Sequence, residues 1–293
     1  MTWRIVSISS VAKLDLRMNY LVIRSGNNEI KKVHLSEISV LIIENTAVSL
    51  TAALLCELNK KKIKVIFCDE KRFPFGEIIP FYGSHDSSEK LRNQINWDPE
   101  IKKSVWTEIV KEKITQQRNH LRKRNMGEES MLTQYIGELQ FFDSSNREGH
   151  AAKVYFNALF GKDFSRQVDS TVNASLNYGY AILLSAIDRE ITSAGYFTQL
   201  GIFHDNVFNP HNFGSDLMEP FRPLIDELVI DLMPDELTPE NKKAILNVLN
   251  REVYIDGKKN YLINALKIYC NSVFSSLSEK DVELLRFCNY DEV

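Results

Sequence analysis

Hydrophobic residues follow a strand-like pattern in the first part of the chain and a helical pattern in the rest. In residues 1–82, short β-branched runs such as Ser39–Asn45 (SVLIIEN) and Ile63–Cys68 (IKVIFC) are separated by turn signals. Such runs are typical of buried strands. One helix is predicted between these two runs, with an apolar face formed by Leu50, Leu54, Leu55 and Leu58. This part of the chain is therefore expected to form a small β-rich domain.

Residues 83–98 (GSHDSSEKLRNQINWD) are polar and contain few apolar anchors, which indicates a linker. From residue 99 to residue 293, apolar residues recur at helical spacing. Two of the predicted helices cover Arg147–Leu159 and Leu217–Met233. We therefore expect an α+β protein in which the small N-terminal domain is followed, after the linker, by a larger all-helical domain.

Composition points to a globular protein of the cytoplasm. Hydrophobic residues make up 44% and charged residues 26%, which is ordinary for a soluble domain. The N-terminus lacks the apolar core of a signal peptide, and no apolar run is long enough to predict a membrane span. The four cysteines form no CxxC pair, so neither a zinc knuckle nor a redox motif is indicated. Scattered cysteines of this kind are typical of reduced thiols in a cytoplasmic protein.

The formal net charge of −3 conceals two segments of opposite sign. Residues 101–125 carry eight basic and two acidic side chains, a net charge of +6, whereas residues 216–240 carry eight acidic side chains and one basic, a net charge of −7. A basic surface can hold a polyanion while an acidic centre collects cations, as expected of a metal-dependent nucleic-acid enzyme. The alternative is that both segments are solvated helix faces.

Candidate metal ligands gather in residues 201–223 (GIFHDNVFNPHNFGSDLMEPFRP). His204 is expected on a loop, and Asp216 and Glu219 stand three apart near the start of a predicted helix, where they would share one face. Glu148, at the start of another helix, is a fourth candidate. Carboxylates with one imidazole and no thiolate suit Mg²⁺ or Mn²⁺. Such a metal supports phosphodiester chemistry.

Each candidate also has a purely structural interpretation. Glu148 could be a helix cap or dipole partner, and His204 a hydrogen-bonded core histidine. Asp216 could be an N-cap, and Glu219 a residue that merely begins a helix. The spacing alone is a weak motif.

Four segments, REGHAAKVYF, LNYGYAILLSAI, LGIFHDN and SDLMEPFRP, occur in this order along the chain. Together they resemble the CRISPR-associated integrase family, the catalytic subunit of the spacer-acquisition complex, and DLMEPFRP in a chain of this length resembles its type II form. The resemblance covers almost the whole chain and implies a small β domain followed by a helical catalytic domain. It also implies that Glu148, His204 and Glu219 hold the metal, with Asp216 as an auxiliary group.

The resemblance implies a metal-dependent transesterification on DNA. The 3′-hydroxyl of a short foreign fragment would attack a phosphodiester at the edge of a CRISPR repeat, and water in place of the hydroxyl would give endonuclease activity. The candidates for contacts with DNA phosphates are Arg118, Arg122, Lys123, Arg124 and Arg222. Two other functions stay open, namely a general metal-dependent DNA nuclease without integrase activity and a non-catalytic DNA-binding scaffold.

The resemblance also implies partners. The β domain would form a homodimer, and a small dimeric CRISPR-associated adaptation protein would bridge two such dimers into a hetero-hexamer. In type II systems, the effector nuclease and a ring-shaped DNA-binding accessory protein are further expected partners.

Overall fold

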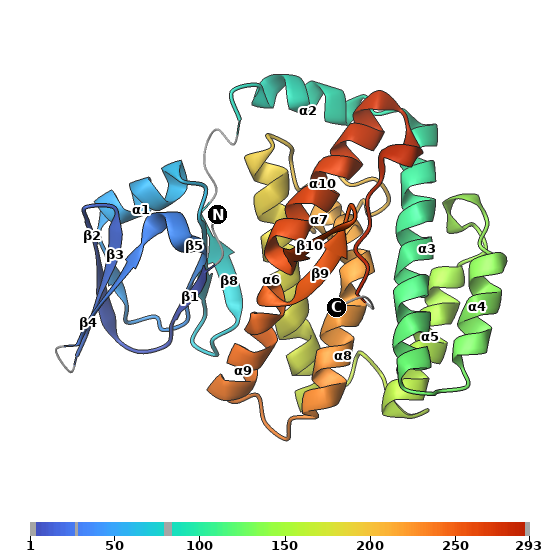
Figure 1. Cartoon of the computed structure of the whole chain (residues 1–293), viewed down its shortest axis with the longest axis horizontal. Helices are drawn as coiled ribbons and strands as arrows, with labels where there is room; N and C mark the ends of the chain where they lie inside the picture. Colours follow the sequence, from blue (N-terminus) through green and yellow to red (C-terminus); the bar gives the residue numbers. More distant parts are fainter. Residues whose placement is uncertain (1–3, 27–28, 79–83, 291–293) are drawn as a thin grey trace. The chain divides into compact units, whose positions relative to one another are not determined.

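The computed structural model describes residues 4–26, 29–78 and 84–290 (Figure 1). The chain divides into two compact units. Unit 1 comprises Met1–Ser87 with Thr192–Tyr196, and unit 2 comprises Ser88–Ile191 with Phe197–Val293. A β-strand region followed by a mainly helical region confirms the predicted α+β class.

Within its described residues, unit 1 contains two four-stranded sheets. The first has the order β1–β5–β7–β8, in which only β8 is antiparallel to its neighbour, and the second has the order β4–β3–β2–β6. Its elements are β1 Arg4–Ile8, β2 Ala12–Arg17, β3 Tyr20–Ser25, β4 Ile30–His34, η1 Leu35–Glu37, β5 Ile38–Ile43, β6 Ser49–Leu50, α1 Ala52–Lys60, β7 Lys64–Cys68 and β8 Pro74–Glu77. All six residues of β5 are buried, as expected for a strand inside a parallel sheet.

The helix of unit 1 starts later than its apolar pattern predicted. The Thr51 side chain accepts a hydrogen bond from the Leu54 N–H at 3.3 Å and so caps α1. Leu50 instead belongs to β6, which pairs with β2. Leu54 and Leu58 are completely buried in the apolar core of this unit, which confirms these two positions of the predicted face, whereas Leu55 is only half-buried.

Unit 2 is built mainly from helices. Its elements are α2 Ser87–Ile95, α3 Pro99–Lys123, α4 Glu129–Gly137, η2 Phe141–Asp143, α5 Arg147–Phe160, α6 Thr171–Ser193, α7 Asn212–Met218, η3 Glu219–Phe221, α8 Arg222–Leu232, α9 Pro239–Leu246, η4 Asn247–Asn250, β9 Glu252–Ile255, β10 Lys258–Tyr261, α10 Leu262–Glu279 and η5 Val282–Leu284. The antiparallel hairpin β9–β10 shows that the prediction of an all-helical domain was too strict. None of the helices in the described ranges is long and apolar enough to cross a membrane.

The polar stretch predicted as a linker contains a helix. Within residues 83–98, α2 presents one buried polar side chain, Gln94. Its amide accepts a hydrogen bond from the Phe197 N–H at 2.9 Å and donates to the carbonyls of Phe197 and Leu200 at 2.8 and 2.9 Å. The satisfied amide of Gln94 and the buried ring of Trp97, which packs against Phe213, therefore anchor a segment in which the sequence offered few apolar side chains.

Helix α3 is the central element of unit 2, where it packs against α4, α5, α7, α8 and α10 (Figure 1). The Asp98 side chain caps its first turn by accepting the Glu100 N–H at 2.9 Å. Trp106 and Ile109 on its inner face are fully buried. This position makes α3 the element from which side chains can reach several other helices.

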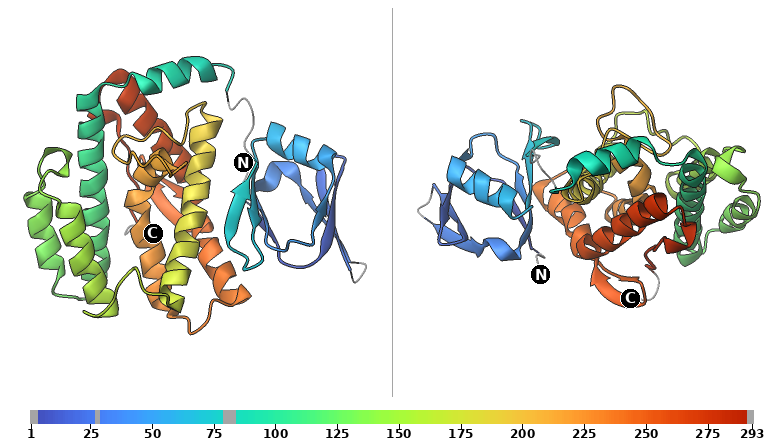
Figure 2. Two further views of the ribbon diagram at one scale, coloured as in Figure 1. Left: turned by 180° about the vertical axis from the view of Figure 1, so that it is seen from behind. Right: turned by 90° about the horizontal axis from the view of Figure 1, so that it is seen from above.

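Helix α6 approaches α8 and α9 closely at one glycine. A Cβ added to Gly179 would lie 2.4 Å from Cγ2 of Ile225 and 3.1 Å from Cγ2 of Ile245. Figure 2 shows α6 beside these two helices from behind. A side chain at Gly179 would therefore separate helices that carry part of the site described below.

The single helix predicted over Leu217–Met233 is broken near its start. Pro220 has no N–H to donate to the carbonyl of Asp216, and the Glu219 N–H donates to that carbonyl instead, in a tighter 3₁₀ turn. As a result, Asp216 ends up in α7 and Glu219 begins η3. The two carboxylates bind different groups, Asp216 the His204 loop and Glu219 the side chains of Lys113 and Arg222.

Candidate metal centre

Glu148 lies in the first turn of α5, and another carboxylate fixes the backbone there. The Asp143 side chain accepts the N–H groups of Arg147 and Glu148 at 2.6 and 3.0 Å. This satisfies two of the N–H groups that a helix start leaves free. The Glu148 carboxylate is then directed toward α3.

Lys113 of α3 joins Glu148 to Glu219. Its Nζ atom lies 2.6 Å from Oε1 of Glu148 and 2.5 Å from Oε2 of Glu219. Nε of Arg222 lies 2.8 Å from the other oxygen, Oε1 of Glu219. Two of the three predicted metal ligands, from helices far apart in the sequence, therefore meet at one cation.

The charges of this cluster stabilise one another. Burial raises the pKa of Glu219, but Arg222 and Lys113 outweigh burial and bring the pKa to about 2. Burial lowers the pKa of Lys113, and the carboxylates of Glu219 and Glu148 more than reverse this, so the pKa lies above the ordinary lysine value. Lys113 and Glu219 are accordingly charged at neutral pH.

The third predicted ligand, His204, is held by Asp216. Oδ1 of Asp216 lies 2.6 Å from Nδ1 of the His204 ring and accepts the His204 backbone N–H at 3.0 Å. Oδ2 accepts the N–H groups of Ile202 and Phe203 at 2.6 and 3.1 Å. With four hydrogen bonds and no exposed surface, Asp216 orients the loop and the imidazole.

Gly201 permits this close wrapping of the loop around Asp216. A Cβ at position 201 would lie 2.3 Å from the His204 carbonyl oxygen and 2.7 Å from Oδ2 of Asp216. Aromatic packing fixes the loop from its other side, because the Phe203 ring stacks on Trp106 with centroids 4.2 Å apart. The loop that carries His204 is thus shaped by a glycine, a buried carboxylate and a buried indole.

The electrostatic surroundings of His204 connect it to the carboxylate pair. The hydrogen bond to Asp216 raises the pKa of His204 and outweighs the opposing effect of burial, with further contributions from the charges of Asp216, Glu219 and Glu148. Since Nδ1 is engaged with Asp216, Nε2 is the ring nitrogen left for a metal. A carboxylate on the far nitrogen is the usual support for a metal-ligating histidine.

The donor set suits a hard divalent cation. Among the described residues, no three His, Cys, Asp or Glu side chains converge closely enough to form a ready metal site. Instead, Glu148 and Glu219 hold the Lys113 ammonium between their oxygens, with a supported imidazole nearby. A position that already holds a cation between carboxylate oxygens fits Mg²⁺ or Mn²⁺ chemistry.

A cavity of about 190 Å³ adjoins Glu219, lined by Lys113, Gln117, Phe156, Arg166, Tyr180, Glu219, Arg222 and Asp226. The guanidinium carbons of Arg222 and Arg166 lie 4.6 and 5.4 Å from the centroid of the Tyr180 ring. The Tyr180 hydroxyl donates to Asp226, and burial raises the pKa of Asp226 to about 7. The cavity is rich in cationic groups, which suits a phosphate-bearing ligand.

Sequence reasoning missed Lys113, Arg166 and Asp226 as parts of this region. By charge alone, Lys113 is only one of the eight basic side chains of residues 101–125. The available signal was its place among apolar residues at helical spacing, because Ile109 and Val110 precede it by one turn and both are completely buried.

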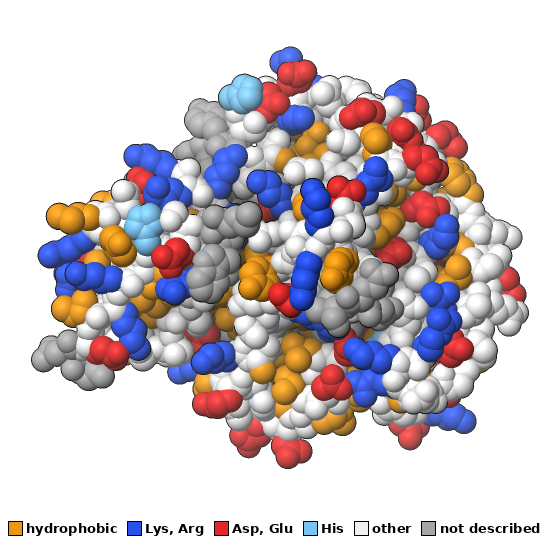
Figure 3. Space-filling model, viewed as in Figure 1, with side chains coloured by type: hydrophobic (Ala, Val, Ile, Leu, Met, Phe, Trp, Pro, Cys, Tyr) orange, Lys and Arg blue, Asp and Glu red, His pale blue; other side chains and the backbone are white. Residues whose placement is uncertain are grey.

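Most side chains predicted to contact DNA form ion pairs within unit 2. Arg122 pairs with Glu129 at 3.4 Å, Lys123 with Glu227 at 2.6 Å, and Arg124 with Asp231. Arg222 pairs with Glu219, and Arg118 donates to the Asn119 side chain. The end of the basic segment and part of the acidic segment therefore neutralise each other between α3 and α8. Figure 3 accordingly shows basic and acidic side chains interspersed over the face it draws.

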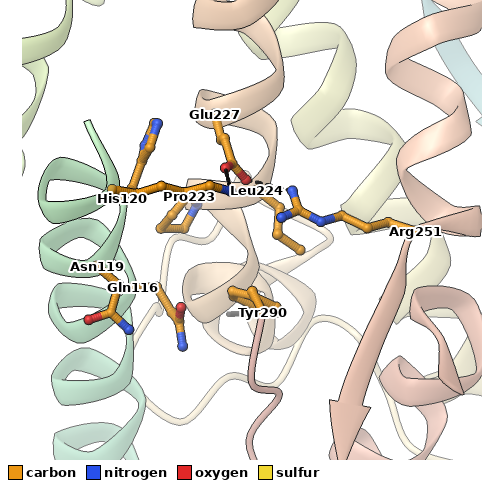
Figure 4. A pocket seen from close by; sticks show the side chains of 9 residues that line it. Gln116, Asn119, His120, Pro223, Leu224, Glu227, Arg251 and Tyr290 are labelled. Atoms are coloured by element: carbon orange, nitrogen blue, oxygen red, sulfur yellow. Dashed lines mark hydrogen bonds and ion pairs between the residues drawn. The ribbon is translucent and has the colours of Figure 1, made fainter. Parts of the chain in front are cut away.

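Glu227 is also part of a small pocket between α3 and α8 (Figure 4). It pairs with Arg251 as well as Lys123, and these cations outweigh burial and lower its pKa to about 2. Burial lowers the pKa of the neighbouring His120 to about 4, which leaves this ring neutral between Tyr155 and Arg124. The volume of about 20 Å³ has room for a single water molecule.

Comparison with known proteins identifies the family. Residues 6–247 match the family model described as "CRISPR associated protein Cas1". The chain belongs to the Cas1 family. It is 35% identical to the CRISPR-associated endonuclease Cas1 of Neisseria meningitidis serogroup C, over 98% of this chain and 96% of that protein. It is 26% identical to a CRISPR-associated endonuclease Cas1 of Francisella tularensis subsp. novicida, over 87% of each chain.

Two solved structures share the fold. A casposase bound to its integration product is 20% identical, with a TM-score of 0.76 and coverage of 96% of this chain and 91% of that chain. A Cas1 protein from Thermotoga maritima is 17% identical, with a TM-score of 0.72 and coverage of 94% and 97%. The family and the enzyme class predicted from the sequence are thereby confirmed, and the Neisseria relative supports the predicted type II form.

Proposed function

We propose that this member of the Cas1 family is a CRISPR adaptation integrase that uses Glu148, His204 and Glu219 to hold Mg²⁺ or Mn²⁺. The observation that carries the proposal is the meeting of the buried Glu219 carboxylate and the partly buried Glu148 carboxylate at one cation position, with an imidazole supported by Asp216 beside them. When bound, the metal supplies activation of a hydroxyl and stabilisation of charge on the phosphate.

The chain's own residues divide the work. Glu148 and Glu219 supply hard oxygen ligands, and Asp216 fixes the ring of His204 so that Nε2 is presented. Arg222 holds Glu219 in place and, with Arg166, lines the adjoining cavity, where both can contact a DNA phosphate.

The proposed reaction exchanges one phosphodiester for another. The 3′-oxygen of the incoming fragment forms a bond to phosphorus while the bond between phosphorus and the 3′-oxygen of the repeat strand breaks, and the proton of the attacking hydroxyl passes to the departing oxygen through solvent. With water as the nucleophile the same centre gives strand cleavage, which is the endonuclease activity named for the Neisseria and Francisella relatives.

The proposed assembly includes DNA and other proteins. A Cas6-RT-Cas1–Cas2 complex contains a chain that matches 96% of this one with a TM-score of 0.72 and 17% identity, although the match covers only 36% of that longer chain. We extend this to a homodimer formed by the β-rich domain of residues 1–82, bridged by a small Cas2-like dimer in a hetero-hexamer. The type II effector nuclease and a ring-shaped DNA-binding protein complete the proposed set, in the cytoplasm.

A strand-transfer assay tests the function. Wild-type protein with its small partner protein should join a labelled 3′-hydroxyl DNA fragment to repeat DNA in Mg²⁺ or Mn²⁺, and a 3′-deoxy fragment should give no product. Glu219→Gln or His204→Ala should reduce joining at least about 100-fold, because each removes a ligand. Cleavage without joining would instead favour a general nuclease, and joining unaffected by both substitutions would favour a DNA-binding scaffold.

A further inference from the structure

Lys113 is a lysine in an environment that rarely holds one. It is 8% exposed, on the inner face of α3, next to the buried Val110 and Ile114. Among the described residues it is the ion-pair partner of Glu148, and it shares Glu219 with Arg222. Its ammonium lies within 2.6 Å of an oxygen from each of two predicted metal ligands.

We propose that Lys113 is a positioning residue whose ammonium takes the place of the metal between Glu148 and Glu219 in the metal-free enzyme and withdraws when the metal binds. This inference rests on the proposed function, because it assumes that these carboxylates are metal ligands.

Electrostatics explains why such a residue is useful. Two carboxylates that approach one point repel each other strongly in a buried setting. Arg222 engages Oε1 of Glu219 and leaves Oε2 and the Glu148 carboxylate to Lys113. The ammonium therefore keeps both ligands together before the metal arrives.

The cavity beside Glu219 supplies a place for the displaced ammonium. Lys113 lines this cavity of about 190 Å³ together with the side chains of Gln117 and Asp226. A lysine has a flexible four-carbon chain, so the ammonium can turn from the carboxylate pair toward the side-chain oxygens of Gln117 and Asp226 without movement of α3. The exchange of the ammonium for the metal keeps a cation between the carboxylates throughout. It leaves the positive charge of the displaced ammonium next to them.

If the ammonium competes with the metal, its removal should have two opposite effects. Lys113→Met should lower the melting temperature of the metal-free protein, because the buried Glu219 carboxylate and the partly buried Glu148 carboxylate lose their shared partner. It should also tighten Mn²⁺ binding at least about tenfold, because no cation has to be displaced and the remaining positive charge is smaller. A merely structural lysine would produce the first effect without the second.

Wild-type, Lys113→Met and Lys111→Met proteins are first treated with EDTA and then titrated with Mn²⁺. Electron paramagnetic resonance of the free Mn²⁺ measures the binding, and thermal unfolding measures the melting temperature of each protein. Lys111 lies on the same helix, is exposed and pairs with Glu108, so its variant should behave as the wild type. Equal or weaker Mn²⁺ binding by Lys113→Met would overturn the inference.

Two further variants separate the possible failures. If Lys113→Met does not fold, Lys113→Arg decides: its larger, permanently charged group should weaken Mn²⁺ binding at least about tenfold, and unchanged binding would overturn the inference. Glu219→Gln tests the metal assignment itself. If it binds Mn²⁺ as the wild type does, the proposed function fails at its ligand set; if it loses binding while Lys113→Met is unchanged, only the role of Lys113 fails.

Discussion

Asp216 shows how much one buried carboxylate can organise. It accepts three backbone N–H groups and contacts the His204 ring, so every acceptor direction is used inside the protein. This explains why the residue three positions before Glu219 has a different task from Glu219. Asp216 shapes the loop of residues 202–204, and Glu219 binds the side chains of Lys113 and Arg222.

Asp216→Asn should therefore be costly although it is nearly isosteric. The amide NH₂ would face N–H donors of the 202–204 loop, and the loss should be about 2–4 kcal/mol of unfolding free energy. The pKa of His204 should fall, because the hydrogen bond to the carboxylate is the largest cause of its raised value. Urea unfolding and an NMR titration of the ring measure these effects. Unchanged values for both would contradict the role assigned to Asp216.

Asp226 should make stability depend on pH. Burial raises its folded-state pKa to about 7 from an ordinary value of 3.8, so the stability linked to its protonated form is present below pH 3.8 and is lost as the pH rises through 7. Between pH 3.8 and pH 7, this contribution to the free energy of unfolding falls by about 1.4 kcal/mol per pH unit. Asp226→Asn lacks this loss, so the stability of the wild type relative to this variant should fall from pH 4.5 to pH 7. A difference that stays constant over this range would rule out the raised pKa.

Some residues of the site could be predicted from the sequence and others could not. Glu148, His204 and Glu219 could be named because they stand in segments that resemble a known family. Lys113, Arg166 and Asp226 stand in no such segment, and their importance arises from contacts between helices that are distant in sequence. Charge counting assigns Lys113 to a surface, although it stands three and four residues after Val110 and Ile109, which the structure shows to be buried.

At the scale of elements, the pairing of α3 with α8 accounts for part of the opposite charges of the two segments. The charge runs were predicted to serve DNA on one side and metal on the other. Lys123 and Arg124 at the end of α3 instead pair with Glu227 and Asp231 of α8. Charge composition cannot distinguish a polyanion from a neighbouring acidic helix, because both satisfy the same side chains.

The two pairs should differ in strength. Glu227 is largely buried and pairs with both Lys123 and Arg251, so Glu227→Gln should cost about 1–3 kcal/mol. The Asp231 side chain is 58% exposed, so Asp231→Asn should cost less than about 1 kcal/mol. Chemical unfolding at pH 7 measures both. Equal costs would show that burial and the second cation do not matter here.

The other elements show where periodicity fails. Pro220 divides the helix predicted over Leu217–Met233, and its effect depends on the missing N–H, which an apolar pattern does not register. Residues 83–98, which contain α2, were predicted to be a linker because Gln94 anchors this helix through hydrogen bonds of its amide, and a polar anchor leaves no apolar pattern in the sequence. Both errors arise where a hydrogen bond decides the structure.

At the scale of the whole molecule, the order of the β-rich and helical regions followed from the sequence pattern. The change from strand runs to helical spacing is long enough in both parts to be unambiguous, and the fold of Cas1 proteins agrees with it. The division into units does not follow from local pattern, since Thr192–Tyr196 groups with unit 1. The chemistry of the molecule is concentrated in unit 2, around α3.

The proposed function requires Glu148, His204 and Glu219 to bind one divalent metal in the active enzyme. The most direct measurement is the anomalous difference density of crystals of the protein soaked in Mn²⁺. The proposed ligand set predicts one peak about 2.0–2.2 Å from oxygens of both glutamates and from Nε2 of His204, with the Lys113 ammonium moved away from the carboxylates. A fully folded, strand-transfer-active protein with no manganese at these three residues would contradict it.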